Sequence, residues 1–135
     1  MTPTGDDKPK QLLTGNDRIH ISDMECLTAI GITAQERASK QQLFVDAEFP
    51  IDCPRAAATD SIDDAVDYDI VARTVADVCA SEEFHLIETV AERVASRILE
   101  QFQVLQVRVR VRKISPVAAP RVAYVSIEIV RPVIS

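Results

Sequence analysis

Polar and apolar residues alternate in four segments of the chain, and this period of two predicts a β-strand for each of them. The four segments are residues 18–27, 43–49, 107–113 and 124–129. In the first segment the alternation slips by one residue near Ser22 and Asp23, which predicts a β-bulge. Pro50 and Pro54 end the second strand, because proline cannot donate to a strand ladder.

Two further segments repeat their apolar residues at helical spacing. They predict one helix over residues 68–80 and another from near Leu86 to about Phe102. Asp67, directly before the first helix, is its expected cap. Residues 52–67 are rich in alanine and aspartate and are predicted to loop around the domain.

The order strand, strand, helix, helix, strand, strand predicts an α+β fold: a four-stranded antiparallel sheet with two helices on one face. The other face is charged, and its simplest interpretation is a solvated face with cross-strand ion pairs. Such a sheet leaves two unpaired edges. Joining copies edge to edge into a closed barrel would pair them, with the helices outside and the charged face around a central tunnel.

Composition narrows the classes of function. At 135 residues the chain is one domain by length, predicted at residues 17–132 behind a flexible N-terminal tail, residues 1–16. The net charge of −6 argues against nucleic-acid binding, which requires a basic excess. No membrane-spanning run or apolar signal region is found, and three scattered cysteines suggest reduced thiols, so a cytoplasmic location is expected.

Few side chains are candidates for chemistry. The two histidines, His20 and His85, lie in different elements, and no metal site is expected from them. Three glycines are too few for a phosphate-binding glycine loop, and no cofactor is expected. Lys113 is the only lysine at the end of a strand, where it is either a solubilising residue or a functional one.

Two glutamates also have two interpretations. Thr33 and Glu36 fit a capping box on a short helical turn. Glu88 lies in the first turn of the second long helix, where free N–H groups and the positive end of the helix dipole favour a carboxylate. Each glutamate is therefore either a structural residue or part of a site.

Four motifs together make the chain resemble the dihydroneopterin aldolase family over about residues 17–132. They are Ile30-Gly31-Ile32 with Glu36, Asp60 to Tyr68, Leu86-Ile87-Glu88 with Ala91 and Glu92, and Val109 to Lys113. The resemblance implies the tunnelling fold, in which ββααββ subunits form a barrel ring of four and two rings stack into an octamer. The active sites of such a homo-oligomer lie between subunits.

The reaction implied by the resemblance is retro-aldol cleavage of a small-molecule pterin, 7,8-dihydroneopterin, on the folate pathway. The products are 6-hydroxymethyl-7,8-dihydropterin and glycolaldehyde. Neither a metal nor a Schiff base is implied, because the C6=N5 imine of the substrate accepts the electrons. The enzyme is also expected to epimerise its substrate at C2′, because both reactions share the retro-aldol intermediate. Two alternatives remain: a dihydroneopterin triphosphate 2′-epimerase, of which the Ile30-Gly31 form is typical, and a pterin-binding barrel without catalysis.

The resemblance also implies roles for individual residues. Lys113 would transfer protons, Glu36 would hold the lysine and a catalytic water, and Tyr68 would be donated by a neighbouring subunit. Glu88 would accept two parallel hydrogen bonds from the 2-amino group and N3 of the pterin. The other substrate-binding positions are Ile87, Asp67 and Val66. The loop of residues 114–120 departs from the family pattern, and no ligand contact is assigned to it.

Overall fold

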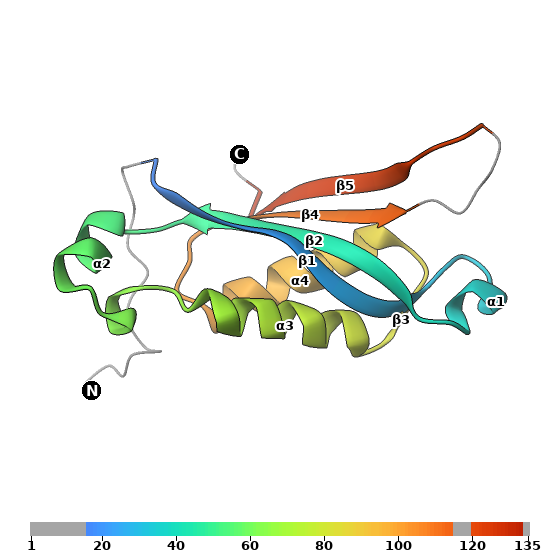
Figure 1. Ribbon diagram of the computed structural model, residues 1–135, viewed down its shortest axis with the longest axis horizontal. Helices are drawn as coiled ribbons and strands as arrows, with labels where there is room; N and C mark the ends of the chain where they lie inside the picture. The colour runs from blue at the N-terminus through green and yellow to red at the C-terminus, as the bar shows by residue number, and fades with distance from the viewer. Residues whose placement is uncertain (1–15, 115–119, 134–135) are drawn as a thin grey trace.

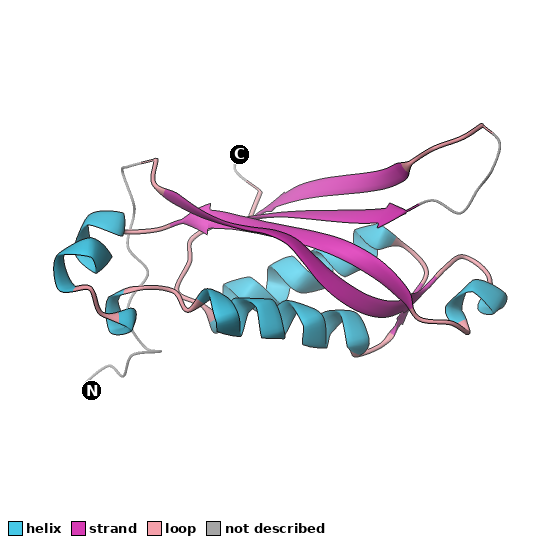
Figure 2. Cartoon of the chain, viewed as in Figure 1, coloured by secondary structure: helices cyan, strands magenta, loops and turns pink. Residues whose placement is uncertain are grey.

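The computed structural model describes residues 16–114 and 120–133, which form a sheet with two long helices on one face (Figure 1, Figure 2). The helices are α3 (Tyr68–Ala80) and α4 (Ile87–Gln101). The strands are β1 (Arg18–Ile30), β2 (Gln41–Pro50), β3 (Glu83–Phe84), β4 (Val107–Ile114) and β5 (Tyr124–Arg131). Residues 1–15 of the predicted tail and 115–119 of the departing loop lie outside the described residues. None of the helices described here has both the length and the apolar character to span a membrane.

The strands lie side by side in the order β3-β1-β2-β4-β5. All neighbours are antiparallel except β3, which runs parallel to β1 with Ala29 opposite Glu83 and Ile30 opposite Phe84. The sheet is therefore five-stranded and mixed. The prediction of four antiparallel strands was wrong in one respect, because it missed the short parallel strand β3. A two-residue strand has no alternation that a sequence pattern can reveal. The α+β class and the two helices on one face are confirmed.

The predicted bulge in β1 is present. The pairing of β1 with β2 shifts register between Ile21 and Met24. Asp23, inside the bulge, has a φ of 54°, a left-handed conformation that aspartate adopts more readily than most residues. Its N–H donates to Oδ1 of Asp46 at 2.6 Å, so a donor that the ladder leaves unpaired is satisfied. β1 continues to Ile30, beyond its predicted end.

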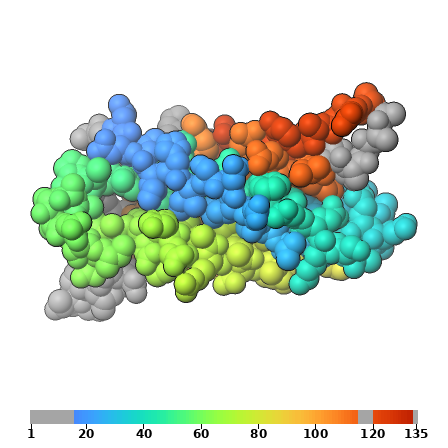
Figure 3. Space-filling model, in the orientation of Figure 1, coloured from blue at the N-terminus to red at the C-terminus, as the bar shows by residue number. Residues whose placement is uncertain are grey.

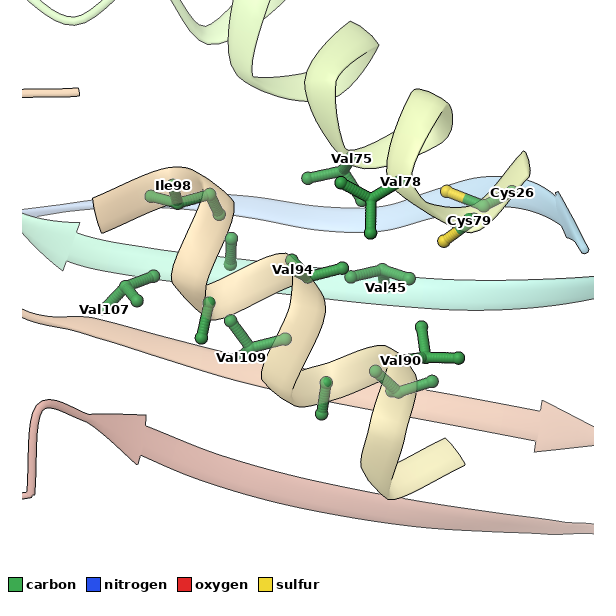
Figure 4. Close-up of a cluster of buried hydrophobic side chains, with 14 of the residues drawn as sticks. Cys26, Val45, Val75, Val78, Cys79, Val90, Val94, Ile98, Val107 and Val109 are labelled. Atoms are coloured by element: carbon green, nitrogen blue, oxygen red, sulfur yellow. The ribbon is translucent and has the colours of Figure 1, made fainter. Parts of the chain in front are cut away.

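The hydrophobic core lies between the sheet and the helices (Figure 4). Every second residue is buried in β2 and over the first part of β4, as the alternation predicts. These residues are Leu43, Val45, Ala47, Phe49, Val107, Val109 and Val111. α3 and α4 cover them mainly with valines, among them Val75, Val78, Val90 and Val94. Each fully buried aliphatic side chain stabilises the fold by about 1.5–3 kcal/mol. The helices therefore cover the face of the sheet on which the alternating apolar residues of β2 and β4 lie.

The segment 52–67, predicted as a loop, contains two short helical pieces. They are α2 (Cys53–Thr59) and the 3-10 helix η2 (Ile62–Asp64). Neither piece has a buried residue, so no apolar period could predict them. Asp67 caps α3 as predicted, because its Oδ1 accepts from the N–H of Asp69 at 3.0 Å.

The outer face of the sheet carries the predicted cross-strand ion pairs. Glu48 on β2 pairs with Nε of Arg18 at 3.0 Å and with Nη1 of Arg108 at 3.3 Å. Nη2 of Arg112 lies 2.9 Å from Oδ1 of Asp23. These contacts link β1, β2 and β4 on the side away from the helices.

The two edges of the sheet differ in how well they are covered. β5 forms one edge, and its inward-facing Val125 is 50% exposed, whereas Ile127 and Ile129 are half-buried. On the other edge, β3 pairs only with the end of β1, so among the described residues β1 has no outer partner before Ala29. These are the two edges on which the predicted barrel depends.

Candidate active site

Four elements meet at one end of the sheet and form the candidate site. β1 and β4 end there, β2 begins there, and α4 begins there directly after β3 (Figure 1). The N–H of Gly31 donates to the carbonyl of Phe84 at 3.1 Å. Leu43, near the start of β2, lies opposite Lys113. Three distant parts of the sequence therefore come together at this end.

Lys113 occupies a position where the strand pattern calls for an apolar residue. It follows Val107, Val109 and Val111 on the inner face of β4. Its side chain is only 19% exposed, and Nζ lies 3.4 Å from Oε2 of Glu36. A partly buried ammonium requires a charged or polar partner, and Glu36 supplies it. The lysine that continues a row of valines is a signal present in the sequence itself.

Glu36 belongs to α1 (Ala34–Arg37), a single helical turn after β1. The predicted N-cap is present, because the N–H of Glu36 donates to Oγ1 of Thr33 at 3.2 Å. The Glu36 carboxylate extends to Lys113 instead, and among the described hydrogen bonds it makes no return bond to Thr33. The capping box is therefore half made, which leaves the carboxylate available to the site.

Two side chains that the sequence analysis did not single out hold the turn between β1 and β2. Arg37 donates from Nη1 to the carbonyls of Gly31 and Ile32, both at 2.9 Å. Gln41 donates from Nε2 to the carbonyl of Glu36 at 3.3 Å. Both residues bind main-chain atoms, so no side-chain motif could have revealed them.

The first turn of α4 lies at the same end. Leu86, the N-cap, makes no side-chain capping bond. Ile87 is half-buried against the core, and Glu88 is exposed. The turn therefore presents backbone N–H groups beside a carboxylate, a combination of donors and an acceptor that suits a flat polar heterocycle.

Tyr68 does not join this cluster. It begins α3 at the opposite end of the molecule, and the thirteen residues of α3 span about 20 Å before the chain returns to the site. Val66 and Asp67 directly precede it. Figure 3 shows the two ends: α1 (cyan) marks the site end and α2 (green) the other. Within one chain, the fold separates Tyr68, Asp67 and Val66 from Glu36 and Lys113.

Glu92, the last residue of the motif that begins at Leu86, pairs with an arginine of the edge strand β5. Nε of Arg131 on β5 donates to Oε1 and Oε2 of Glu92 on α4, at 3.1 and 3.2 Å. The motif therefore combines a carboxylate at the candidate site with one that packs β5 against α4.

The cysteines take no part in the candidate site. Cys26 on β1 and Cys79 on α3 are buried free thiols in the core (Figure 4). A hydrogen bond with Cys26, together with burial, raises the pKa of Cys79. Cys53 is exposed. Over residues 16–114 and 120–133, no three His, Cys, Asp or Glu side chains gather as a metal site would require.

Comparison with known proteins shows a family for this chain. The family model for dihydroneopterin aldolase matches residues 19–130 of the chain. The dihydroneopterin aldolase of Escherichia coli strain K12 is 34% identical over 115 residues, which cover 85% of this chain and 93% of that protein. A crystal structure of the E. coli dihydroneopterin aldolase in complex with neopterin has a TM-score of 0.80 at 34% identity, and the match covers 85% of this chain and 98% of that one. The dihydroneopterin aldolase of Burkholderia thailandensis, bound to guanine, has a TM-score of 0.68 at 27% identity, with 85% and 89% covered.

Proposed function

Because this chain belongs to the dihydroneopterin aldolase family, we propose that Lys113 carries out the proton transfers of its reaction and that Glu36 holds Lys113 and a catalytic water in place. The chain is an aldolase of the lyase class. It cleaves 7,8-dihydroneopterin into 6-hydroxymethyl-7,8-dihydropterin and glycolaldehyde in folate biosynthesis. The observation that carries the proposal is the 3.4 Å contact between Nζ of Lys113 and Oε2 of Glu36, which are 77 residues apart in sequence.

The cleavage requires a base at oxygen and an acid at carbon. When the 2′-hydroxyl loses its proton, the C2′=O bond of glycolaldehyde forms and the C1′–C2′ bond breaks. The electron pair of that bond forms a C6=C1′ enamine, and the former C6=N5 π pair takes up a proton at N5. Protonation of C1′ and loss of the N5 proton then give the hydroxymethyl product. Because the substrate's own imine accepts the electrons, the proposed mechanism uses neither a metal nor a Schiff base.

Lys113 is the proton-transfer group in this mechanism, acting through a water at the 2′-hydroxyl and at the enamine. Glu36 holds the ammonium and the water in place. The partial burial of the lysine side chain favours this role, because charge interactions strengthen as water is excluded. A positioned proton-transfer group typically contributes about 10²–10⁴-fold to the rate.

Glu88 and the backbone at Ile87 bind the pterin ring in the proposed site. A carboxylate accepts two parallel hydrogen bonds from a 2-amino group and the adjacent ring N–H. Neopterin, bound to the E. coli enzyme, and guanine, bound to the Burkholderia enzyme, both present such an edge. The exposure of Glu88 at the site end leaves its carboxylate accessible to that edge.

Tyr68 completes the proposed site from a neighbouring subunit, together with Asp67 and Val66. Two features of the chain support this. Tyr68 is 63% exposed at the end far from Lys113, and the sheet has two edges that a neighbouring copy can pair. The proposed assembly is a homo-oligomer, a ring of four subunits or two stacked rings. The proposed location is the cytoplasm.

Incubation of the purified protein with 7,8-dihydroneopterin tests the proposal through the release of glycolaldehyde. Lys113→Ala and Glu36→Gln should still bind neopterin while kcat falls about 10²-fold or more. Full activity of Lys113→Ala would overturn the assigned chemistry. Epimerised dihydroneopterin triphosphate with negligible glycolaldehyde would identify the triphosphate epimerase instead, and binding without turnover would identify a non-catalytic barrel.

A further inference from the structure

Glu36 is carried by an element with little stability of its own. α1 has four residues, none of them buried, and so short a helix does not persist without outside support. Yet Oε2 of Glu36 must stay within reach of Lys113, and their distance of 3.4 Å is already long for a hydrogen bond. A small displacement of the turn would separate the pair.

The main chain that supports Glu36 is the segment just before α1. An ideal Cβ placed on Gly31 would lie 2.2 Å from Cβ of Glu36, so the glutamate side chain rests directly on this glycine. Any movement of the backbone at Gly31 therefore moves Glu36. The position of the catalytic carboxylate depends on what fixes this backbone.

Arg37 is one of the groups that fix it, together with Gln41 and the hydrogen bond from the N–H of Gly31 to Phe84. Its Nη1 lies 2.9 Å from the carbonyl oxygen of Gly31 and 2.9 Å from that of Ile32. Hydrogen bonds from a charged donor are roughly twice as strong as neutral ones. The guanidinium is planar and preorganised, so little freedom is lost when it binds two carbonyls at once. Arg37, the last residue of α1, thereby binds back to the two residues that directly follow β1.

We propose that Arg37 is a positioning residue for the aldolase reaction: it clamps the carbonyls of Gly31 and Ile32 and so holds the Glu36 carboxylate on Lys113. The inference rests on the proposed catalytic role of Glu36 and Lys113 and adds a residue that acts through them. Because Arg37 binds the main chain that supports Glu36, we expect its loss to lower kcat. Ligand binding at Glu88 should stay intact.

The first experiment compares kcat with neopterin affinity in Arg37→Ala. Loss of the clamp should lower kcat about 10-fold or more, because an ångström of misplacement can cost about 10²-fold. The Kd for neopterin should stay close to wild type, and a cooperative urea transition should show that the variant still folds. Arg37→Lys keeps a charged donor and should recover part of kcat. Arg93→Ala is the matched control: Nε of Arg93 lies 3.5 Å from Oε2 of Glu82 on the exposed surface, and its kcat should equal wild type.

A double variant separates positioning from an unrelated structural effect. In a Glu36→Gln background, adding Arg37→Ala should lower kcat little further, because the carboxylate that Arg37 positions is already lost. Multiplicative losses would show that Arg37 acts independently of Glu36 and would overturn the proposal. Wild-type kcat in Arg37→Ala would also overturn the proposal, as would weaker neopterin binding at unchanged kcat. In either case a lower kcat in Glu36→Gln would still support the proposed function. Unchanged kcat in Glu36→Gln itself would refute the role of Glu36 in the proposed function, and the inference about Arg37 would fail with it.

Discussion

The side chain of Glu36 lies so close to Gly31 that a Cβ on Gly31 would be 2.2 Å from the Cβ of Glu36. The backbone does not require glycine here, because φ of Gly31 is not positive. The glycine of the Ile30-Gly31-Ile32 motif is therefore explained by close approach of a catalytic side chain. The sequence gives this glycine only as part of a family resemblance, and the structure supplies the physical reason for it, which is the close approach of Glu36.

Gly31→Ala should displace Glu36 from Lys113. A methyl group cannot fit at that distance from another Cβ, so either the turn or the glutamate must move. We expect kcat for glycolaldehyde release to fall about 10²-fold, with neopterin affinity close to wild type. Ser39→Ala, at the exposed far end of the same turn, is the control. Wild-type kcat in Gly31→Ala would show that the contact with Glu36 does not matter.

Glu88→Ala should abolish tight pterin binding with the fold intact. Two charge-assisted hydrogen bonds are lost, each worth about 1.5–3 kcal/mol, so the Kd for neopterin should rise about 10²-fold or more. Isothermal titration measures it. The control is Glu100→Ala, which removes an exposed carboxylate at the other end of α4. An unchanged Kd in Glu88→Ala would leave the residue as a helix-stabilising acid.

Tyr68 and Lys113 should complement each other between subunits. Tyr68→Phe and Lys113→Ala are each expected to be poorly active. When the two are unfolded together and refolded as a mixture, about a quarter of sites in a mixed ring should combine an intact Lys113 with an intact Tyr68. Glycolaldehyde release should then exceed that of either variant refolded alone. No gain in a mixture shown to contain hybrid oligomers would mean that each site takes both residues from one chain.

The pair formed by Arg131 and Glu92 should stabilise the edge strand modestly. Their side chains are 32% and 46% exposed, so solvent screens the pair, and Arg131→Ala should cost about 0.5–1 kcal/mol. Urea unfolding at a fixed protein concentration measures the free energy, and a double-mutant cycle with Glu92→Ala isolates the coupling. Arg73→Ala, which removes an exposed pair with Asp69 within α3, should cost less. A coupling energy of zero would show that packing alone holds β5.

The cysteines should differ in their reactivity toward iodoacetamide. Cys53 is exposed and should be alkylated in the folded protein. Cys26 and Cys79 are buried, and the raised pKa of Cys79 keeps its thiol protonated, whereas the thiolate is the reactive form. Peptide mapping by mass spectrometry should find these two labelled only after unfolding in urea. Labelling of Cys79 as fast as Cys53 under native conditions would contradict the packing of α3 on β1.

The sequence by itself determined the features that depend on neighbours along the chain. Alternation placed the four main strands and the bulge in β1, and helical spacing placed α3 and α4. Asp67 was identified as a cap for the same reason, because a cap binds an N–H two residues away. The motifs around Gly31, Glu88 and Lys113 were sufficient to indicate the family.

Only the tertiary structure decided the features that depend on register and packing. β3 exists because Phe84 reaches β1 after α3, and two residues carry no periodic signal. Arg37 was not predicted because it binds carbonyl oxygens, which every residue has. Lys113 meets Glu36 because β2 and β4 pair with Leu43 opposite Lys113, at the point where the turn from β1 enters β2. The sequence contained both residues of that pair, and the register of the sheet brought them together.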